Sequence, residues 1–213
     1  MKGLVLGVWL AMVLPLHAQD TCFVSQPIPD GVFARMQGKS YPKDCPTPRA
    51  ELRYLSLSYR DARGQTRQGE MVCHRRIAAD LVSIFRQLWL ADYRIERMQL
   101  VDDYGADDQR SMAANNTSCF NFRYISGTRT VSKHGQGMAV DINPLYNPYV
   151  YTRGGVRRVE PLAGRPYATH RERLQGVPFL ITRSDLCYRL FRQHGFRWGG
   201  DWTRSKDYQH FEK

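Results

Sequence analysis

Long apolar runs are scarce in this chain of 213 residues, and no stretch after residue 18 approaches the length of a membrane-spanning helix. The five cysteines include no CxxC pair, which argues against a structural zinc knuckle. A composition of 42% hydrophobic and 24% charged residues excludes a disordered, collagenous or coiled-coil chain. We expect one domain with a single core, no transmembrane segment, and a monomer.

Acidic residues are the minority: 20 Asp and Glu oppose 31 Lys and Arg, which gives a net charge of +11. A surface of this kind attracts polyanions. The basic residues are scattered and match no nucleic-acid-binding motif, so we expect no nucleic-acid partner. An anionic polymer or a membrane surface is the better candidate, and a basic surface that serves only solubility is an equal alternative.

The first eighteen residues have the pattern of a signal peptide. Lys2 is followed by apolar residues from Gly3 to Leu16, and Ala18 offers a small residue for cleavage. We therefore expect export to the periplasm or the extracellular space after cleavage near Ala18. The alternative, a buried N-terminal helix, lacks an amphipathic period.

The rest of the chain divides at about residue 50. Residues 19–50 are rich in Pro, Gly and polar residues and predict an extended N-terminal arm, while residues 51–213 form the main domain. Strands and helices follow there without a βαβ rhythm, which indicates an α+β class with a small antiparallel sheet and flanking helices. Periodicity predicts strands at 52–59, 69–74, 95–101, 138–143, 196–198 and 208–212, helices at 75–91 and 185–194 with Ser184 as the second N-cap, and loops at 102–116 and 144–173.

Two segments concentrate residues that bind metals. His134 lies in a glycine-flanked loop, and Asp141 follows seven positions later in an apolar run. His210 lies close to the C-terminus and can complete a set of three protein ligands. A His/Asp/His set with an open fourth position is the coordination of a catalytic zinc. The sequence therefore predicts one catalytic Zn²⁺.

The residues around these ligands resemble a known family. Ser132–Asp141 reads SKHGQGMAVD and fits the pattern S-x-H-x-x-G-x-A-x-D. It is similar to the zinc signature of VanY-like D-alanyl-D-alanine carboxypeptidases and of L-alanyl-D-glutamate peptidases, which share the fold of the Hedgehog signalling domain. Segments 115–123, 198–202 and 207–212 resemble the same group. The resemblance extends over about residues 70–213 and implies a Hedgehog/DD-peptidase-like zinc peptidase fold.

The resemblance also implies roles for individual residues. His134, Asp141 and His210 would hold the zinc, and Asp207 would be the general base. Arg123 would polarise the scissile carbonyl or bind the substrate carboxylate. The remaining expected substrate contacts are Ser132, as a hydrogen-bonding group, and Trp198 and Trp202, which can wall the cleft or lie in the core.

Three functions are compatible with this pattern. The leading one is a zinc-dependent D-Ala-D-Ala carboxypeptidase acting on peptidoglycan peptides, with anionic cell-wall polymer as a further partner. The second is an endopeptidase that cuts an L-Ala–D-Glu bond, and the 144–173 loop is expected to decide between the two. The third is a zinc-containing cell-wall binding module without turnover. Because Asp207 and Arg123 are both present, we favour an active enzyme.

The cysteines give a separate expectation. Because their number is odd, at least one thiol is unpaired or pairs between chains. In the family that the chain resembles, the positions of Cys119 and Cys187 are commonly small and apolar, so we expect these two to form a disulfide. Cys22 and Cys45 are expected to form a second, which leaves Cys73 as a buried free thiol.

Overall fold

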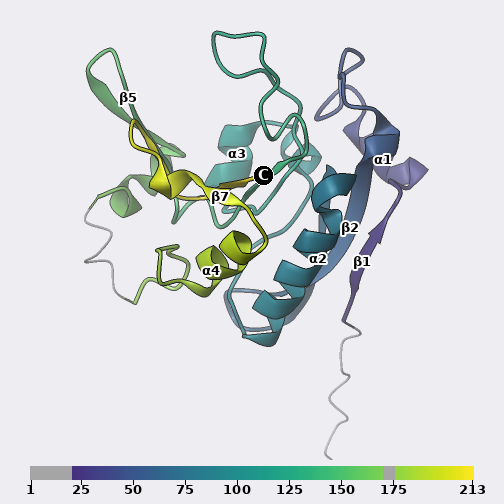
Figure 1. Cartoon of the computed structure of the whole chain (residues 1–213), viewed down its shortest axis with the longest axis horizontal. Coiled ribbons are helices and arrows are strands. Elements are labelled where there is room, and N and C mark those ends of the chain that lie inside the picture. Colours follow the sequence, from purple (N-terminus) through teal and green to yellow (C-terminus); the bar gives the residue numbers. More distant parts are fainter. Residues whose placement is uncertain (1–20, 170–175) are drawn as a thin grey trace, which may run out of the picture.

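The computed structural model describes residues 21–169 and 176–213. The expected signal peptide lies outside the described residues. Within them, no helix is both long and apolar enough to cross a bilayer. The described part combines helices with small antiparallel sheets, which agrees with the predicted class (Figure 1).

The first sheet contains the longest strands of the molecule. Strands β1 (Phe23–Gln26), β2 (Leu52–Arg60) and β3 (Thr66–His74) pair in this order, and both pairings are antiparallel. The β2–β3 hairpin turns at Asp61, whose Oδ1 accepts hydrogen bonds from the backbone N–H groups of Arg63 and Gln65. This local side-chain acceptor is why the sequence turns here, and the strands predicted at 52–59 and 69–74 pair as the two arms of this hairpin.

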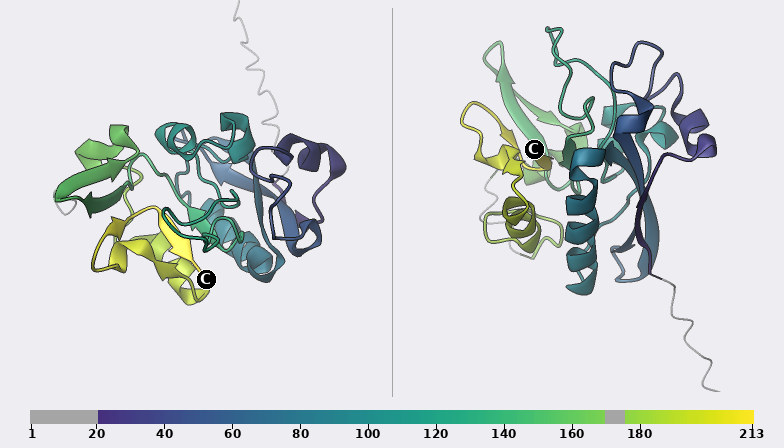
Figure 2. Two further views of the ribbon diagram at one scale, coloured as in Figure 1. Left: turned by 90° about the horizontal axis from the view of Figure 1, so that it is seen from above. Right: turned by 45° about the vertical axis from the view of Figure 1, so that its right-hand side comes forward.

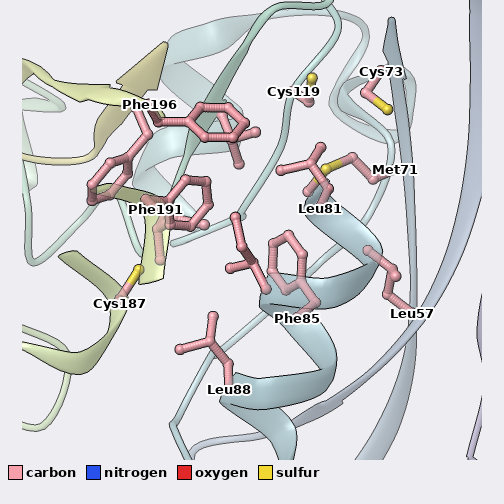
Figure 3. Packing of buried hydrophobic residues seen from close by; sticks show 14 of the residues in the cluster. Leu57, Met71, Cys73, Leu81, Phe85, Leu88, Cys119, Cys187, Phe191 and Phe196 are labelled. Carbon is pink, nitrogen blue, oxygen red and sulfur yellow. The ribbon is translucent and has the colours of Figure 1, made fainter. Parts of the chain in front are cut away.

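Helix α2 (Arg75–Leu90) covers this sheet and forms the centre of the core. Its buried residues recur every three or four positions, as in an amphipathic helix, and they are Ile77, Ala78, Leu81, Ile84, Phe85 and Leu88. Helix α4 (Leu186–Gln193) lies across the core from α2, and Figure 3 shows Phe191 and Phe196 facing the α2 side chains. The N-cap of α4 is Asp185, whose carboxylate accepts from Cys187 N–H; the predicted cap, Ser184, is therefore wrong by one residue.

The segment predicted as an extended arm is partly regular. It contains β1, helix α1 (Asp30–Met36) and the 3₁₀ turn η1 (Arg49–Glu51). Its apolar side chains join a second buried cluster made of Ile28, Met36, Leu52, Val72, Leu100 and Phe120. The arm thus contributes an edge strand, and its buried residues Ile28 and Met36 pack against residues of the main domain in a shared cluster.

The described residues of the C-terminal half form two smaller sheets, whose strands are two to five residues long. In one sheet β9 lies between β4 and β7, and in the other β5 lies between β6 and β8; every pairing is antiparallel. The strands are β4 (Ala139–Asp141), β5 (Tyr149–Arg153), β6 (Val156–Glu160), β7 (Arg197–Trp198), β8 (Lys206–Asp207) and β9 (His210–Glu212). Figures 1 and 2 place the first sheet and the β5–β6 hairpin on opposite sides of the molecule.

Two predicted segments differ from the structure. The strand expected at 95–101 is replaced by isolated bridges at Arg94 and Arg97. The loops expected at 102–116 and 144–173 contain regular elements, namely η2 (Val101–Tyr104), α3 (Asp108–Ala113), the β5–β6 hairpin and η3 (Leu162–Tyr167). The hairpin turns at Gly154 and Gly155, which both have positive φ. A Gly-Gly pair between alternating residues is a two-residue hairpin signal, and it was available in the sequence.

The cysteine pairing expected from the sequence is wrong. All five cysteines are free thiols in the structure, so neither predicted disulfide is formed. Cys187 lies beside Asp185 and Tyr93, whereas Cys119 and Cys73 lie near each other on the far side of the core (Figure 3). Cys73 is buried and free, as predicted, and burial raises the pKa of its thiol.

Candidate metal centre

A tight turn positions His134. The Ser132 hydroxyl accepts from Gly135 N–H at 3.0 Å, and the carbonyl of His134 accepts from Gly137 N–H at 2.9 Å. Gly137 has a φ of +67°, and a Cβ there would lie 2.7 Å from the backbone nitrogen of His74. Only glycine fits this close approach, which explains why the turn before β4 contains it.

The ring of His134 is oriented by a backbone carbonyl. Its Nδ1 lies 2.7 Å from the carbonyl oxygen of Cys119. A carbonyl oxygen only accepts, so Nδ1 carries the proton and donates it. Nε2 is therefore the nitrogen with a free lone pair, and it faces the other two candidate ligands.

Strand pairing brings the other two candidate ligands together. Asp141 in β4 lies directly opposite His210 in β9, and residues opposite each other in an antiparallel pair share a face. His134 Nε2 lies 3.3 Å from Asp141 Oδ2, and His210 Nδ1 lies 3.2 Å from Asp141 Oδ1. The two imidazole nitrogens, His134 Nε2 and His210 Nδ1, are 3.1 Å apart. Residues 76 positions apart in sequence thus meet at one buried point.

Glu212 contacts the nitrogen of His210 that points away from the other two candidate ligands. It lies two residues after His210 in β9 and therefore on the same face. Its Oε2 is 3.3 Å from His210 Nε2, and its Oε1 is 2.7 Å from Arg197 Nη2. With Nε2–H donating to Glu212, Nδ1 is the nitrogen that faces His134 and Asp141. Sequence reasoning missed this contact, although the spacing His-x-Glu in a strand was its signal.

The donor set fits a divalent metal ion. Ligand atoms about 2.1 Å from a tetrahedral zinc are about 3.4 Å apart, close to the separations observed here. The three side chains offer ligand atoms that all lie within 4.8 Å of one another, and all three residues are buried. Two imidazole lone pairs and a carboxylate directed at one buried point repel one another unless a cation or a proton lies between them.

Charges within the cluster shift the pKa values of these groups. Burial alone would lower the pKa of His210, but its hydrogen bonds to Asp141 and Glu212 raise the pKa to about 10. Burial opposes ionisation of Asp141, but His134 and His210 hold the pKa of its carboxyl well below the usual range. In the absence of a metal, the cluster therefore contains a proton on His210 and a negative charge on Asp141. A cation held by these three residues would take the place of that proton.

Asp207 lies beside the three candidate ligands. Gly199 packs on it so closely that a Cβ would lie 2.6 Å from the Asp207 carbonyl oxygen. Its Oδ1 is buried and has no hydrogen-bond partner within residues 21–169 and 176–213. Burial raises the pKa of the Asp207 carboxyl to about 7, with His210 lowering it and Asp141 raising it. A buried carboxylate oxygen without a partner is suited to accept a proton from water or substrate.

Arg123 is held by an acidic residue of α3. Its Nε lies 3.0 Å from Asp108 Oδ2, and Asp108 Oδ1 also accepts from the Asn121 side chain at 2.7 Å. The charge of Arg123 lowers the pKa of Asp207, so the guanidinium acts on the centre electrostatically. The role of Asp108 in holding Arg123 was not foreseen from the sequence, since Asp108 falls in a segment expected to be a loop.

The three expected substrate contacts have different environments. The Ser132 hydroxyl is engaged within the turn that contains His134. Trp198 is 5% exposed and donates its Nε1–H to the Tyr208 carbonyl, so it lies in the core, one of the two expected alternatives. The ring of Trp202 lies 5.3 Å from the ring of His210, measured between centroids. Of the three, Trp202 is therefore the one placed beside the metal cluster.

Comparison with known proteins agrees with this arrangement. Residues 126–213 match a family model described as D-alanyl-D-alanine carboxypeptidase. No curated protein and no solved structure matches the chain. The matched segment contains His134, Asp141, Asp207 and His210, whereas Arg123 precedes it. The match confirms the resemblance of the chain to the VanY-like family of D-alanyl-D-alanine carboxypeptidases over residues 126–213.

Proposed function

We propose that this protein is an exported, zinc-dependent peptidase that hydrolyses peptidoglycan peptides, and that it acts as a D-Ala-D-Ala carboxypeptidase. The observation that supports the proposal most strongly is the convergence of His134 Nε2, Asp141 and His210 Nδ1 within 3.1–3.3 Å of one another. The other nitrogen of each imidazole donates elsewhere, so His134 Nε2 and, once its proton is displaced, His210 Nδ1 are the nitrogens that would bind a metal at this point. The domain that performs this function is proposed to span residues 51–213, with a Hedgehog/DD-peptidase-like fold.

His134, Asp141 and His210 are the residues that would hold the zinc. When bound, zinc supplies Lewis-acid chemistry: it acidifies water and polarises a carbonyl group. Asp207 is proposed as the general base, because its Oδ1 is buried, unpartnered and next to the ligands. It accepts the proton of the attacking water and delivers it to the leaving amine.

Arg123 supplies the positive charge. Its side chain is 37% exposed, so it is accessible to a substrate while Asp108 fixes its position. In a carboxypeptidase, it can pair with the terminal carboxylate in a bidentate way or stabilise the oxyanion of the tetrahedral intermediate. Trp202, beside His210, is proposed to form a wall of the cleft.

Hydrolysis of defined peptides tests the proposal. Zinc-loaded protein is incubated with purified muropeptides that end in D-Ala-D-Ala, and the products are weighed by mass spectrometry. Release of one terminal alanine supports the carboxypeptidase. Cleavage at an internal L-Ala–D-Glu bond would show an endopeptidase instead. Zinc binding without any product would show a binding module.

A further inference from the structure

The sheet that contains Asp207 extends into a basic hairpin. Strand β8 pairs with β5 so that Asp207 lies opposite Tyr149, and β5 pairs with β6 so that Tyr149 also lies opposite Glu160. Further along the hairpin, Tyr151 lies opposite Arg158, and Arg153 lies opposite Val156. Directly opposite and alternate residues share one face of an antiparallel sheet. Asp207, both tyrosines and both arginines therefore line a single face.

This face forms a continuous path away from the candidate metal centre. The rings of Tyr149 and Tyr151 stack with their centroids 4.7 Å apart. At about 3.3 Å per residue, Tyr151 and Arg158 lie about 7 Å from the Asp207 position, and Arg153 lies about 13 Å from it. These distances match two to four residues of an extended peptide.

The outer end of the path is a positively charged hollow. It has a volume of about 400 Å³ and is bounded between α3, η3 and the hairpin by residues that include Gln109, Tyr151, Arg153, Arg158, Glu160 and Arg165. Glu160 is the acidic residue among them, and its Oε1 accepts from the Tyr151 hydroxyl at 2.7 Å. The three arginines are exposed, and none of them forms an ion pair within the described parts of the chain. Among the lining residues that the structure describes, three cations against one anion give the hollow a surplus of positive charge.

We propose that this hollow is a substrate subsite that binds a carboxylate of the peptide, two to four residues before the scissile bond. The inference rests on the proposed carboxypeptidase function, because such a substrate has one residue after the scissile bond and any longer stretch must lie before it. Tyr149 and Tyr151 form the floor of the path, and Arg158 and Arg153 bind the carboxylate. Guanidinium groups suit this task because they offer paired N–H donors to the two carboxylate oxygens.

Paired peptides test the subsite. N-acetylated peptides ending in D-Ala-D-Ala carry either Glu or Gln at the second, third or fourth residue before the scissile bond. With zinc-loaded wild-type protein, we expect KM for the best glutamate peptide to be roughly three- to tenfold lower than for its glutamine partner. Arg158→Gln and Arg153→Gln should reduce this preference. Arg157→Gln is the matched control, because Arg157 lies on the same hairpin but alternates to the opposite face and donates to the Ala168 carbonyl.

The outcomes separate this proposal from the proposed function. Equal KM values for Glu and Gln peptides, or an equal loss of preference in Arg157→Gln, would overturn the subsite while leaving the peptidase intact. If no peptide is cleaved, the proposed function fails, and calorimetric titration of the same peptides still decides the subsite. Tighter binding of the glutamate peptide by wild type than by Arg158→Gln supports the subsite, and equal binding overturns it.

Discussion

The first sheet with helix α2 differs from the small C-terminal sheets in the length of its elements and in the polarity of the side chains that are buried. Strands β2 and β3 are nine residues long, α2 has sixteen residues, and their shared interior is apolar. Strands β4, β8 and β9 have two or three residues each, and the segments around them bury polar side chains. These are Asn115, Asn116, Thr117, Asn121, His134, Asp141, Asn143, Asn147, Gln209 and His210. We infer that the first region supplies stability and the second supplies chemistry.

The buried asparagines explain how the second region holds together with so little regular structure. The side chain of Asn143 accepts from Glu96 N–H and donates to the Arg94 carbonyl. The side chain of Asn147 accepts from Ile181 N–H and donates to the Phe179 carbonyl. Side-chain amides satisfy backbone groups that a longer strand would pair with another strand. The irregular backbone around the metal cluster is therefore fixed by specific polar contacts. Loss of one partner would leave a buried polar group without a hydrogen bond, which destabilises the fold.

The sharpest test of the division is Asp207→Asn. The substitution keeps the shape of the side chain but removes its capacity to accept a proton, so turnover should fall by about 10²–10⁴ while zinc content stays near normal. His210→Ala is the contrasting variant, because it removes a ligand and should lower zinc content itself. Zinc content and peptide hydrolysis are measured on the same preparations. Loss of zinc in Asp207→Asn would make Asp207 a ligand, and full activity would assign proton transfer to another residue.

Phe85→Ala should lower the stability of the fold and leave the candidate metal centre intact. Phe85 is 1% exposed at the centre of α2, and its truncation leaves a cavity that should lower the free energy of unfolding by about 3–5 kcal/mol. The zinc affinity of the folded variant should be unchanged, since Phe85 is absent from the candidate metal centre. Denaturant unfolding and zinc titration of one preparation measure both quantities. A large loss of zinc affinity in the folded variant would contradict the division between the two regions.

The same division explains what the sequence could predict. The β2–β3 hairpin and α2 were predictable because each has an apolar periodicity that spans many residues. The residues in this pattern are buried in the core, where their packing stabilises the strands and the helix. The segment 95–101 also contains several apolar residues, yet its backbone forms only an isolated bridge from Arg97 to Asn116 and has no continuous strand partner. An apolar periodicity indicates which side chains are buried, but it does not indicate whether a neighbouring strand is available for pairing.

The candidate ligands were found by a different route. His134, Asp141 and His210 were singled out through the motif and its family resemblance, and the structure brings these three side chains together. The contacts that orient them were not predicted. The Cys119 carbonyl and Glu212 act through positions that depend on the register of β4, β9 and the turn before them, and a motif does not specify register. The expected Cys119–Cys187 disulfide is not formed, because both residues are buried but lie on different sides of the core.

Glu212→Gln tests whether Glu212 orients His210 or only stabilises the fold. Loss of the carboxylate behind His210 Nε2 should weaken zinc binding by about 10- to 100-fold, the usual effect of removing such a partner. Glu70→Gln is the matched control, because Glu70 also pairs with an arginine at 2.7 Å, in the first sheet. Chelator competition gives the zinc affinity, and denaturant unfolding gives the stability. A Glu212→Gln variant that loses stability but binds zinc normally would restrict Glu212 to a structural role.

The smallest expected effect, taken per pH unit, is the pH dependence of zinc binding. In the metal-free protein, the hydrogen bonds of His210 to Asp141 and Glu212 raise its pKa to about 10, so His210 is protonated at neutral pH. Zinc must displace this proton, because an imidazole nitrogen binds the metal only when it is deprotonated. The sign follows directly: a higher pH favours the metal, and the apparent association constant should rise about tenfold per pH unit between pH 6 and 8. Calorimetry in buffers of different ionisation enthalpy should find about one proton released per zinc, and a zinc affinity that is constant over this range would show that His210 already presents a free lone pair.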